Sequence, residues 1–238
     1  MDKLVAIKEE IGKIGINLSD DQVNKFLIYY NMLIEKNKVM NLTAITEFDE
    51  VLKKHFVDSL CIIKAYDLSK DITLLDLGTG AGFPGIPIKI AFPNINVVLM
   101  DSLNKRLNFL NEVMNELNLQ KIETVHGRAE ELGNSTLYRE HFDICVSRAV
   151  AKLSSLAEYC LPFVRVGGSF IAYKSDEISM ELDNSANAVS ILGGKLKEKV
   201  SFTLPDSDIQ RTLVIIDKLK NTPKKYPRQA GKPNKEPL

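Results

Sequence analysis

One stretch decides the fold of this chain: Leu74-Leu75-Asp76-Leu77-Gly78-Thr79-Gly80-Ala81-Gly82. It begins as an apolar run, carries one carboxylate at Asp76, and then places a glycine at every second position. Glycine lets a ligand approach the backbone closely and tolerates positive φ angles. Pro84 follows, where the first turn of a helix tolerates its missing N–H. A strand, a glycine loop and a helix in this order predict a nucleotide-binding unit.

The segments that follow alternate between apolar runs and helical patterns. Runs rich in strand formers recur at residues 95–100, 122–125, 142–146 and 169–173. Helical patterns separate them, at residues 85–91, 104–118 and 154–161. This alternation predicts an α/β fold whose mostly parallel sheet is covered by helices on both faces. Two further runs, 195–204 and 210–217, lie close together in the chain and predict an antiparallel last strand.

The two ends of the chain differ from this middle part. Ser19 followed by Gln22 has the pattern of a capping box, an apolar helical face follows, and Thr46 is a candidate cap for another helix. The last 21 residues carry seven Lys or Arg, four Pro and no apolar periodicity, so we expect them to be extended or loosely held. We therefore divide the chain into a helical extension over residues 1–68, a sheet domain over 69–217 and a basic tail over 218–238.

Composition excludes several classes of protein. The chain holds 31 basic and 31 acidic residues, so its net charge indicates no partner. No apolar run approaches the roughly 18 residues of a membrane span, and the start lacks the apolar core of a signal peptide. Three cysteines stand far apart, as do three histidines, and no Cys-x-x-Cys pair exists. We therefore expect a cytoplasmic protein with no membrane contact and no metal site.

Two cofactors compete for the glycine loop. Residues 80–85 satisfy the Gly-x-Gly-x-x-Gly spacing of dinucleotide binders, and Asp101 stands where that fingerprint expects a carboxylate for the ribose. S-adenosylmethionine instead carries an ammonium and a sulfonium group, which Asp76 would attract, whereas this acid would repel a pyrophosphate. A dehydrogenase also needs a proton relay, and the Tyr66 and Lys70 pair precedes the loop. The sequence favours S-adenosylmethionine, with Asp101 on the ribose in either interpretation.

Two more motifs follow later strands. Gly127-Arg128-Ala129-Glu130 comes after the third predicted strand, where backbone and a carboxylate would border an adenine. Ser147-Arg148-Ala149 comes after the fourth. Ligands of open α/β sheets lie beyond the carboxyl ends of the strands, so these motifs should converge on one crevice. An acid at a solvated helix start is the alternative explanation of Glu130.

Motifs along nearly the whole chain resemble a known family. They are Asn41–Ala44, His55–Leu60, Asp76–Gly85, Lys105-Arg106, Phe109-Leu110, Gly127–Glu131, Ser147–Ala151, Thr222–Arg228 and Gly231–Pro233. Together they resemble the glucose-inhibited division protein B family, also called RsmG, the 16S ribosomal RNA guanine-N7 methyltransferases. Such chains often carry a Trp shortly before the Asn-Leu-Thr loop, whereas this one reads Glu35-Lys36-Asn37 and contains no Trp.

The resemblance implies a Rossmann-like class I methyltransferase fold. It also implies S-adenosyl-L-methionine as cofactor, S-adenosyl-L-homocysteine as product, and 16S rRNA or the small ribosomal subunit as substrate. We expect the protein to be a monomer. Cofactor contacts are implied at Gly78, Phe83, Ala129, Glu130 and Arg148. With the loop and strand-end residues, the expected cofactor set becomes Asp76, Gly78, Gly80, Gly82, Phe83, Asp101, Ala129, Glu130 and Arg148.

RNA contacts are expected mainly from the basic tail and the helical extension. Lys224, Lys225 and Arg228 would neutralise phosphates, and Tyr226 would stack on a base. The expected RNA set also includes Asn41, His55 and Lys174. A solvated tail without a partner, and a purely structural His55, are the open alternatives.

The chemistry inferred from the sequence agrees with guanine N7. This atom has an in-plane lone pair and loses no proton on alkylation, so it needs placement rather than a base. The sequence lacks the Asp/Asn-Pro-Pro-aromatic stretch typical of amine methylation, and Cys145 lies in an apolar strand rather than in a nucleophile's setting. Arg148 is the candidate catalytic residue beside cofactor and base. A nicotinamide-dependent oxidoreductase and a non-catalytic RNA-binding factor are the rival classes.

Overall fold

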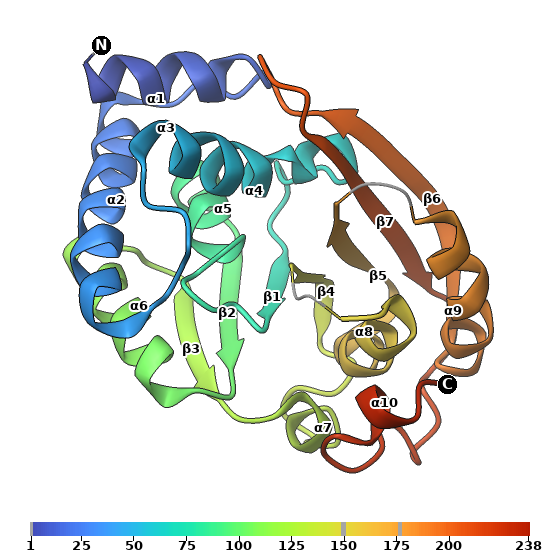
Figure 1. Cartoon of the computed structure of the whole chain (residues 1–238). Helices are drawn as coiled ribbons and strands as arrows, with labels where there is room; N and C mark the ends of the chain where they lie inside the picture. Colours follow the sequence, from blue (N-terminus) through green and yellow to red (C-terminus); the bar gives the residue numbers. More distant parts are fainter. Residues whose placement is uncertain (1, 149–150, 176–177) are drawn as a thin grey trace.

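The computed structural model describes residues 2–148, 151–175 and 178–238. Among these, a seven-stranded sheet runs in the order β3-β2-β1-β4-β5-β7-β6 (Figure 1). The strands are β1 Thr73–Leu77, β2 Asn96–Asp101, β3 Ile122–His126, β4 Phe142–Ser147, β5 Val164–Lys174, β6 Gly194–Thr203 and β7 Gln210–Lys218. Strands β1 to β5 pair in parallel, and β7 is antiparallel to both neighbours. The predicted mostly parallel sheet with an antiparallel last strand is confirmed, with β7 lying between β5 and β6.

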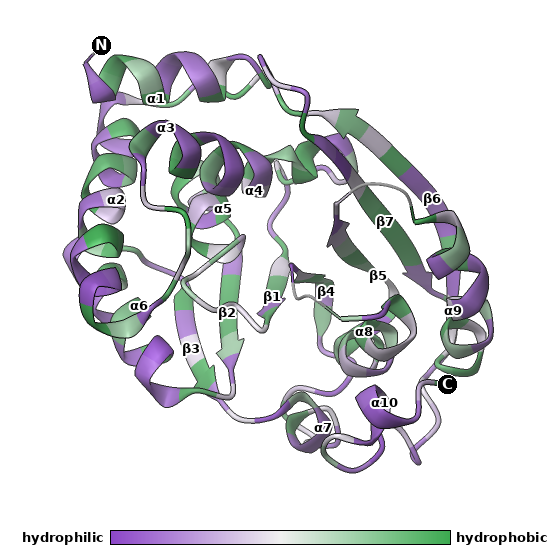
Figure 2. Cartoon of the chain, viewed as in Figure 1, coloured by the Kyte–Doolittle hydropathy of each residue, from purple (hydrophilic) through white to green (hydrophobic). Residues whose placement is uncertain are grey.

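Helices cover both faces of this sheet (Figure 1). One face carries α1 Lys3–Gly12, α2 Asp20–Met40, α3 Phe48–Val51, α4 Asp58–Leu60, α5 Gly85–Ala91 and α6 Asn104–Glu116. The other carries α7 Ala129–Leu132, α8 Leu153–Cys160, α9 Ser179–Ile191 and α10 Lys232–Lys235. Successive strand residues feed opposite cores, since Leu74 packs in the first and Leu75 in the second. Figure 2 shows central strands such as β1 and β7 largely apolar, the edge strand β6 alternating between polar and apolar residues, and the outer helices striped with polar residues.

The helical extension shares its core with the sheet. Ser19 and Gln22 form the predicted capping box at the start of α2, with both reciprocal hydrogen bonds present. Ile7 and Phe26 are completely buried and belong to the same cluster as Leu74. The expectation that Thr46 caps the next helix is wrong, because α3 begins at Phe48 with Glu47 as its N-cap and no side-chain cap bond.

Two features of the second half differ from expectation. Helix α9 was not predicted, since its sequence is rich in Ser and Asn, which are poor helix formers, and few of its residues are buried. The tail is not loosely held: Thr222 donates from Oγ1 to the Leu192 carbonyl at 2.7 Å, and Arg139 donates to the Thr222 carbonyl at 2.6 Å. Partners far away in sequence hold this segment, so local composition gave no sign of them.

A search of the described residues finds no helix that is both long enough and apolar enough to cross a bilayer.

Candidate functional site

Asp76 holds the glycine loop from below. Its side chain is completely buried near the end of β1. Oδ2 accepts hydrogen bonds from Thr79 Oγ1 at 2.6 Å and from the Gly85 N–H at 2.8 Å. Because these two donors lie on opposite ends of the loop, one carboxylate oxygen fixes how the loop leaves the strand and enters α5.

The second oxygen of Asp76 has no hydrogen-bond partner among the described residues. Oδ1 is buried and accepts no hydrogen bond from any described residue. Burial raises the pKa of Asp76 to about 6, while its Thr79 and Gly85 hydrogen bonds and the nearby Arg148 act in the opposite direction. An unpaired buried acceptor is costly, so a donor that reached this oxygen would relieve the cost of its burial.

Asp101 ends β2 beside the loop. Its Oδ2 accepts from the Gly80 N–H at 3.0 Å, and its Oδ1 accepts from the Leu103 N–H at 2.9 Å. Arg106 Nη1 lies 3.3 Å from Oδ2. A carboxylate has about four lone-pair sites, so Asp101 keeps capacity for a ligand hydroxyl while it anchors the loop.

A cavity of about 370 Å³, here called the cofactor cavity, lies over these strand ends. The expected cofactor residues Gly78, Asp101, Ala129 and Glu130 line it, and Ser147 and Tyr159 complete its floor and side. Gly78 has φ of 73° and nothing within 4 Å of the place a Cβ would take, so a ligand has room against its backbone. The predicted convergence of four strand ends on one crevice is confirmed.

The C-terminal segment forms one wall of the cofactor cavity, which the sequence had not indicated. Gly231 and Asn234 line the cavity. The Gly231 N–H donates to Glu130 Oε1 at 2.8 Å, and Ser155 Oγ donates to the Pro233 carbonyl at 2.8 Å. Glu130 is therefore more than a solvated helix-start acid, since it joins the tail to the sheet. The Gly231-Lys232-Pro233 motif marked this place, but nothing local tied it to the cavity.

Three expected cofactor residues, Gly80, Gly82 and Phe83, belong to the loop but do not line the cofactor cavity. A Cβ on Gly82 would lie 2.8 Å from Tyr29 Oη, so this glycine allows α2 to pack closely. Phe83 is 8% exposed and stacks on His55 with ring centroids 4.5 Å apart. Gly80 joins the loop to Asp101 through its N–H. Contacts of the cofactor with these three residues stay predictions.

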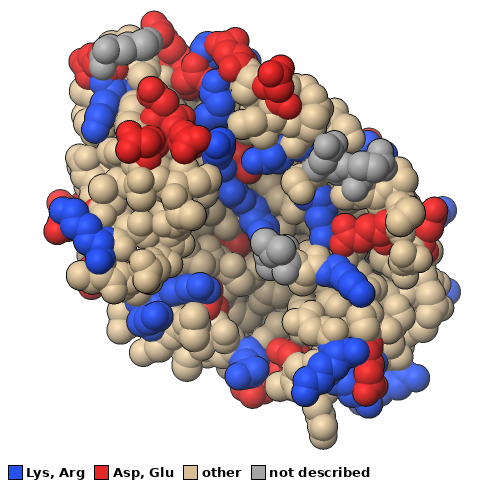
Figure 3. Space-filling model, in the orientation of Figure 1, with Lys and Arg blue, Asp and Glu red and all other residues tan. Residues whose placement is uncertain are grey.

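Arg148 lies in a second cavity of about 620 Å³, here called the basic cavity. Its lining includes Arg148, Lys152, Lys174 and Arg211 together with Asp58 and Glu181. Arg148 donates to Ser59 Oγ at 3.0 Å and lies 3.4 Å from Asp58 Oδ2. Figure 3 shows Lys and Arg side chains running into the hollow between the N-terminal helices and the α8–α9 side. Residues 149–150 of the Ser147–Ala151 motif lie outside the described part of the chain.

The structure separates the remaining expected RNA residues. Lys224 and Lys225 are exposed, as phosphate contacts require. Tyr226 is only 6% exposed and lies in the second core, so it is not available to stack on a base. Arg228 donates from Nε and Nη2 to both oxygens of the buried Glu158, so an internal partner occupies it. These two residues hold the segment in place.

His55 and Asn41 occupy structural positions of the helical extension. His55 is 8% exposed, and its Nε2 lies 2.9 Å from Thr43 Oγ1. Burial, aided by the charge of Arg148, lowers the pKa of His55 to about 4, so the ring is neutral at physiological pH. Asn41 is exposed and ends α2 in the left-handed conformation, with φ of 48°. RNA contacts of either residue stay predictions.

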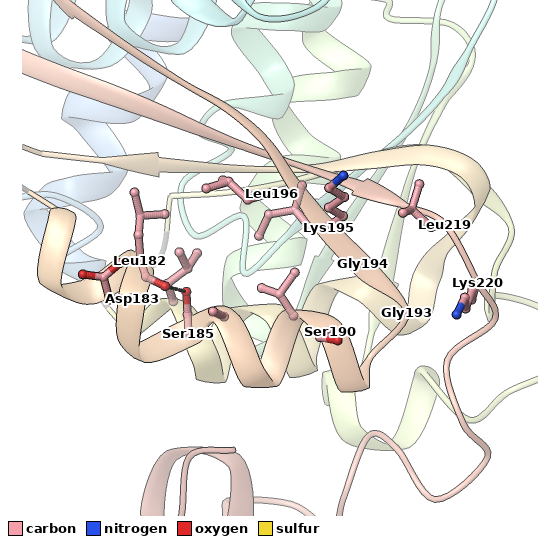
Figure 4. A pocket seen from close by; sticks show the side chains of 14 residues that line it. Leu182, Asp183, Ser185, Ser190, Gly193, Gly194, Lys195, Leu196, Leu219 and Lys220 are labelled. Carbon is pink, nitrogen blue, oxygen red and sulfur yellow. Dashed lines mark hydrogen bonds between the residues drawn. The ribbon is translucent and has the colours of Figure 1, made fainter.

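A third cavity of about 440 Å³ lies apart from this chemistry, between α9 and strands β6 and β7 (Figure 4). Its lining is largely apolar, with Leu182, Leu196 and Leu219 pointing toward it. It contains none of the residues that the sequence indicated. We therefore place the functional site at the cofactor cavity and the basic cavity, on either side of the end of β4.

The glycine loop, the strand-end acids and the sheet order define a class I, Rossmann-like methyltransferase fold. Solved structures agree on the fold. YcgJ from Bacillus subtilis matches with a TM-score of 0.54 and 13% identity over 70% of this chain and 100% of that chain. TYW2 from M. jannaschii matches with a TM-score of 0.51 and 11% identity over 63% of this chain and 71% of that chain.

Sequence relatives define the family within this class. The family model for rRNA small subunit methyltransferase G, GidB, matches residues 22–213. A ribosomal RNA small subunit methyltransferase G from Lachnoclostridium phytofermentans is 60% identical, over 96% of this chain and 94% of that protein. Another from Alkaliphilus metalliredigens is 50% identical over 100% of both chains. The chain belongs to the rRNA small subunit methyltransferase G family.

Proposed function

We propose that this chain transfers the methyl group of S-adenosylmethionine to N7 of a guanine in the 16S rRNA of the small ribosomal subunit. The observation that carries the proposal is the cavity at the strand ends, lined by Gly78, Asp101 and Glu130, beside a glycine loop under which the buried Oδ1 of Asp76 accepts no hydrogen bond from the described residues. An ammonium group that reached this oxygen would form a charge-assisted hydrogen bond with it. Family membership supports the same activity, because the relatives are named as ribosomal RNA small subunit methyltransferases.

The residues of the cofactor cavity fit this methyl donor better than a dinucleotide. Glu130 lines the cavity and Asp76 lies buried beneath the loop, and both carboxylates favour a cationic ligand over a pyrophosphate. Asp101 and Glu130 would hold ribose and adenine, and the Gly78 backbone would border the amino-acid part. When bound, S-adenosylmethionine supplies an electrophilic methyl group, which guanine N7 takes with its own lone pair while sulfur keeps the electrons of the broken C–S bond. The TYW2 structure from M. jannaschii contains AdoMet on a similar fold.

Guanine N7 also suits the side chains around the two cavities. N7 transfer needs no general base, and placement alone can supply on the order of 7–11 kcal/mol. Carbon methylation of a pyrimidine would need a thiolate. Burial raises the pKa of Cys61 to about 12 and that of Cys145 well above its usual value, so neither thiol is suited to attack. The site is therefore built to position a base.

The basic cavity and the exposed tail lysines supply the RNA contacts in this proposal. Arg148, Lys174 and Arg211 bring positive charge to the cavity beside the cofactor. Lys224 and Lys225 extend the contact to phosphates farther along the RNA. We further propose that the protein works as a monomer in the cytoplasm, which sedimentation of the protein alone and fractionation of cells would test.

The decisive experiment incubates the protein with methyl-labelled cofactor and small subunits from cells that lack the enzyme. We expect label on N7 of one guanine, located by mapping the modified base. Calorimetry adds a second readout, in which S-adenosylmethionine binds and NAD does not. Binding of NAD alone would indicate an oxidoreductase, and RNA binding without methyl transfer would indicate a non-catalytic factor.

A further inference from the structure

The basic cavity contains a donor and an acceptor held side by side, and the proposed reaction uses the donor, Lys174, only as a positive charge and gives the acceptor, Glu181, no role. Lys174 Nζ lies 2.7 Å from Glu181 Oε1 and donates to the Ala151 carbonyl at 2.7 Å. Glu181 Oε1 also accepts from the Leu153 N–H at 2.6 Å. Both side chains line the cavity and are largely buried, at 11% and 29% exposure.

Each member of this pair keeps unused hydrogen-bonding capacity. An ammonium group has three donors, and the described residues occupy two of those of Lys174. Glu181 Oε2 accepts no hydrogen bond from the part of the chain that the structure describes. The pair therefore offers one donor and one carboxylate oxygen to a ligand in the cavity.

We propose that Glu181, with Lys174 beside it, recognises the Watson–Crick edge of the acceptor guanine. This inference rests on the proposed function. Guanine presents the O6 acceptor next to the N1–H and N2–H donors, which match the Lys174 donor and the Glu181 acceptor. Adenine presents the reverse order, an N6 amine followed by the N1 acceptor, so it would set donor against donor and acceptor against acceptor. The pair therefore selects guanine.

The order of the groups across the sheet agrees with the order of atoms along guanine. Strand β4 lies next to β1, and β5 lies next to β4. Going away from the glycine loop, Arg148 follows β4, Lys174 ends β5, and Glu181 stands beyond it on α9. The guanine atoms follow the sequence N7, O6, N1 and N2. With O6 on Lys174 and both N1–H and the 2-amino group on Glu181 Oε2, N7 faces back toward the cofactor cavity.

Glu181 also contributes to the chemical step. Methyl transfer leaves N7-alkylated guanine with a positive charge, which makes N1–H a stronger donor. The hydrogen bond from N1–H to the Glu181 carboxylate is therefore stronger in the transition state than in the ground state, which is the condition for raising kcat.

The competing explanation is purely structural, because Glu181 also holds the start of α8 through the Leu153 N–H. Inosine separates the two explanations, since it differs from guanosine only by the missing 2-amino group. The experiment uses small subunits reconstituted with 16S rRNA that carries either base at the mapped acceptor. It compares wild type, Glu181→Gln and a control, Asp183→Asn, which removes an exposed carboxylate of the same helix outside the basic cavity.

We expect wild type to lose about 10- to 100-fold in kcat/KM on inosine, as for the loss of a hydrogen bond to a charged group. Glu181→Gln should show a similar loss of kcat/KM on guanosine. Its kcat/KM values on guanosine and on inosine should then differ by less than about threefold. Its cofactor affinity should equal that of wild type, and Asp183→Asn should behave as wild type throughout.

Two results would overturn the assignment. Equal kcat/KM values of wild type on guanosine and on inosine would overturn it, whatever the result for Glu181→Gln. If Glu181→Gln is slow but its ratio of kcat/KM on guanosine to kcat/KM on inosine equals that of wild type, then Glu181 has a structural role only. Absence of methyl transfer by wild type to guanosine subunits would instead refute the proposed function, and this inference with it.

Discussion

The two cavities beside the end of β4 are built in different ways. The cofactor cavity is lined by backbone and short side chains, such as Gly78 and Ala129, together with longer ones such as Arg106 and Tyr159, and its acids are fixed by N–H groups. The basic cavity is lined by long charged side chains, and both Arg148 and Arg211 lie beside Asp58. Backbone N–H groups therefore hold the acids of the cofactor cavity, whereas ion pairs hold the arginines of the basic cavity. Substitutions should therefore separate binding of the cofactor from use of the acceptor base.

The largest expected effect concerns the wall that closes the cofactor cavity. Arg228→Ala would leave the fully buried Glu158 without its bidentate partner. Breaking a buried pair in this way costs about 3–5 kcal/mol of unfolding free energy. Urea unfolding measures the loss, with Arg228→Lys as the control that keeps the charge but not the fork. A loss below about 1 kcal/mol would mean that Arg228 behaves as a surface charge available to RNA.

The next effect tests whether the two cavities act separately. Arg148→Ala should lower kcat/KM for methyl transfer by about 100-fold, or about 2.7 kcal/mol, because Arg148 organises the basic cavity. Cofactor affinity should change by less than about threefold, since Arg148 does not line the cofactor cavity. Arg165→Ala, an exposed arginine outside both cavities, is the matched control. Unchanged activity would remove Arg148 from the site. A loss of cofactor affinity as large as the loss of kcat/KM would mean that the two cavities act as one site.

The part of the cofactor cavity that Gly78, Asp101, Ala129 and Glu130 line was predictable because its signals are local. Asp76, the alternating glycines and Asp101 stand at strand ends that the sequence itself delimits. The motif around Glu130 follows its strand in the same way. Each of these residues is placed by a parallel sheet, whose strands end at one edge.

The rest depends on contacts between distant segments. Gly231 meets Glu130 across 101 positions of sequence, and Lys174 meets Glu181 only because α9 forms. The basic tail predicts that Tyr226 stacks on a base, whereas the structure buries this side chain in the second core. No periodicity or composition announces such packing, because the partner is absent from the local window.

A smaller effect should come from the C-terminal wall itself. Asn234→Ala removes a polar side chain that lines the cofactor cavity, and cofactor affinity should fall by about threefold to tenfold. Calorimetry measures it. Lys225→Ala is the control from the same segment, and it should leave cofactor affinity unchanged while lowering the salt dependence of RNA binding by about one charge. If both variants bind the cofactor as wild type does, the wall encloses the cavity without touching the ligand.

The smallest effect is a pH dependence that belongs to the cofactor cavity alone. Burial raises the pKa of Asp76 to about 6, with Arg148 acting against the shift and Asp101 adding to it. A raised pKa means that this group favours the folded state below the unfolded value of 3.8, an advantage lost as pH rises through about 6.

A cationic cofactor binds the ionised form of Asp76 and so reverses that preference. Its affinity should therefore be constant above about pH 7 and weaken below about pH 6, by at most about tenfold per pH unit. Calorimetry across this range measures the slope, and Asp76→Asn should flatten it while binding more weakly at every pH. A flat profile for wild type would mean that Oδ1 of Asp76 finds no ammonium, and the loop would then hold its ligand through backbone alone. Binding of RNA at the basic cavity should show no such dependence on pH, because the arginines of this cavity stay charged over this range.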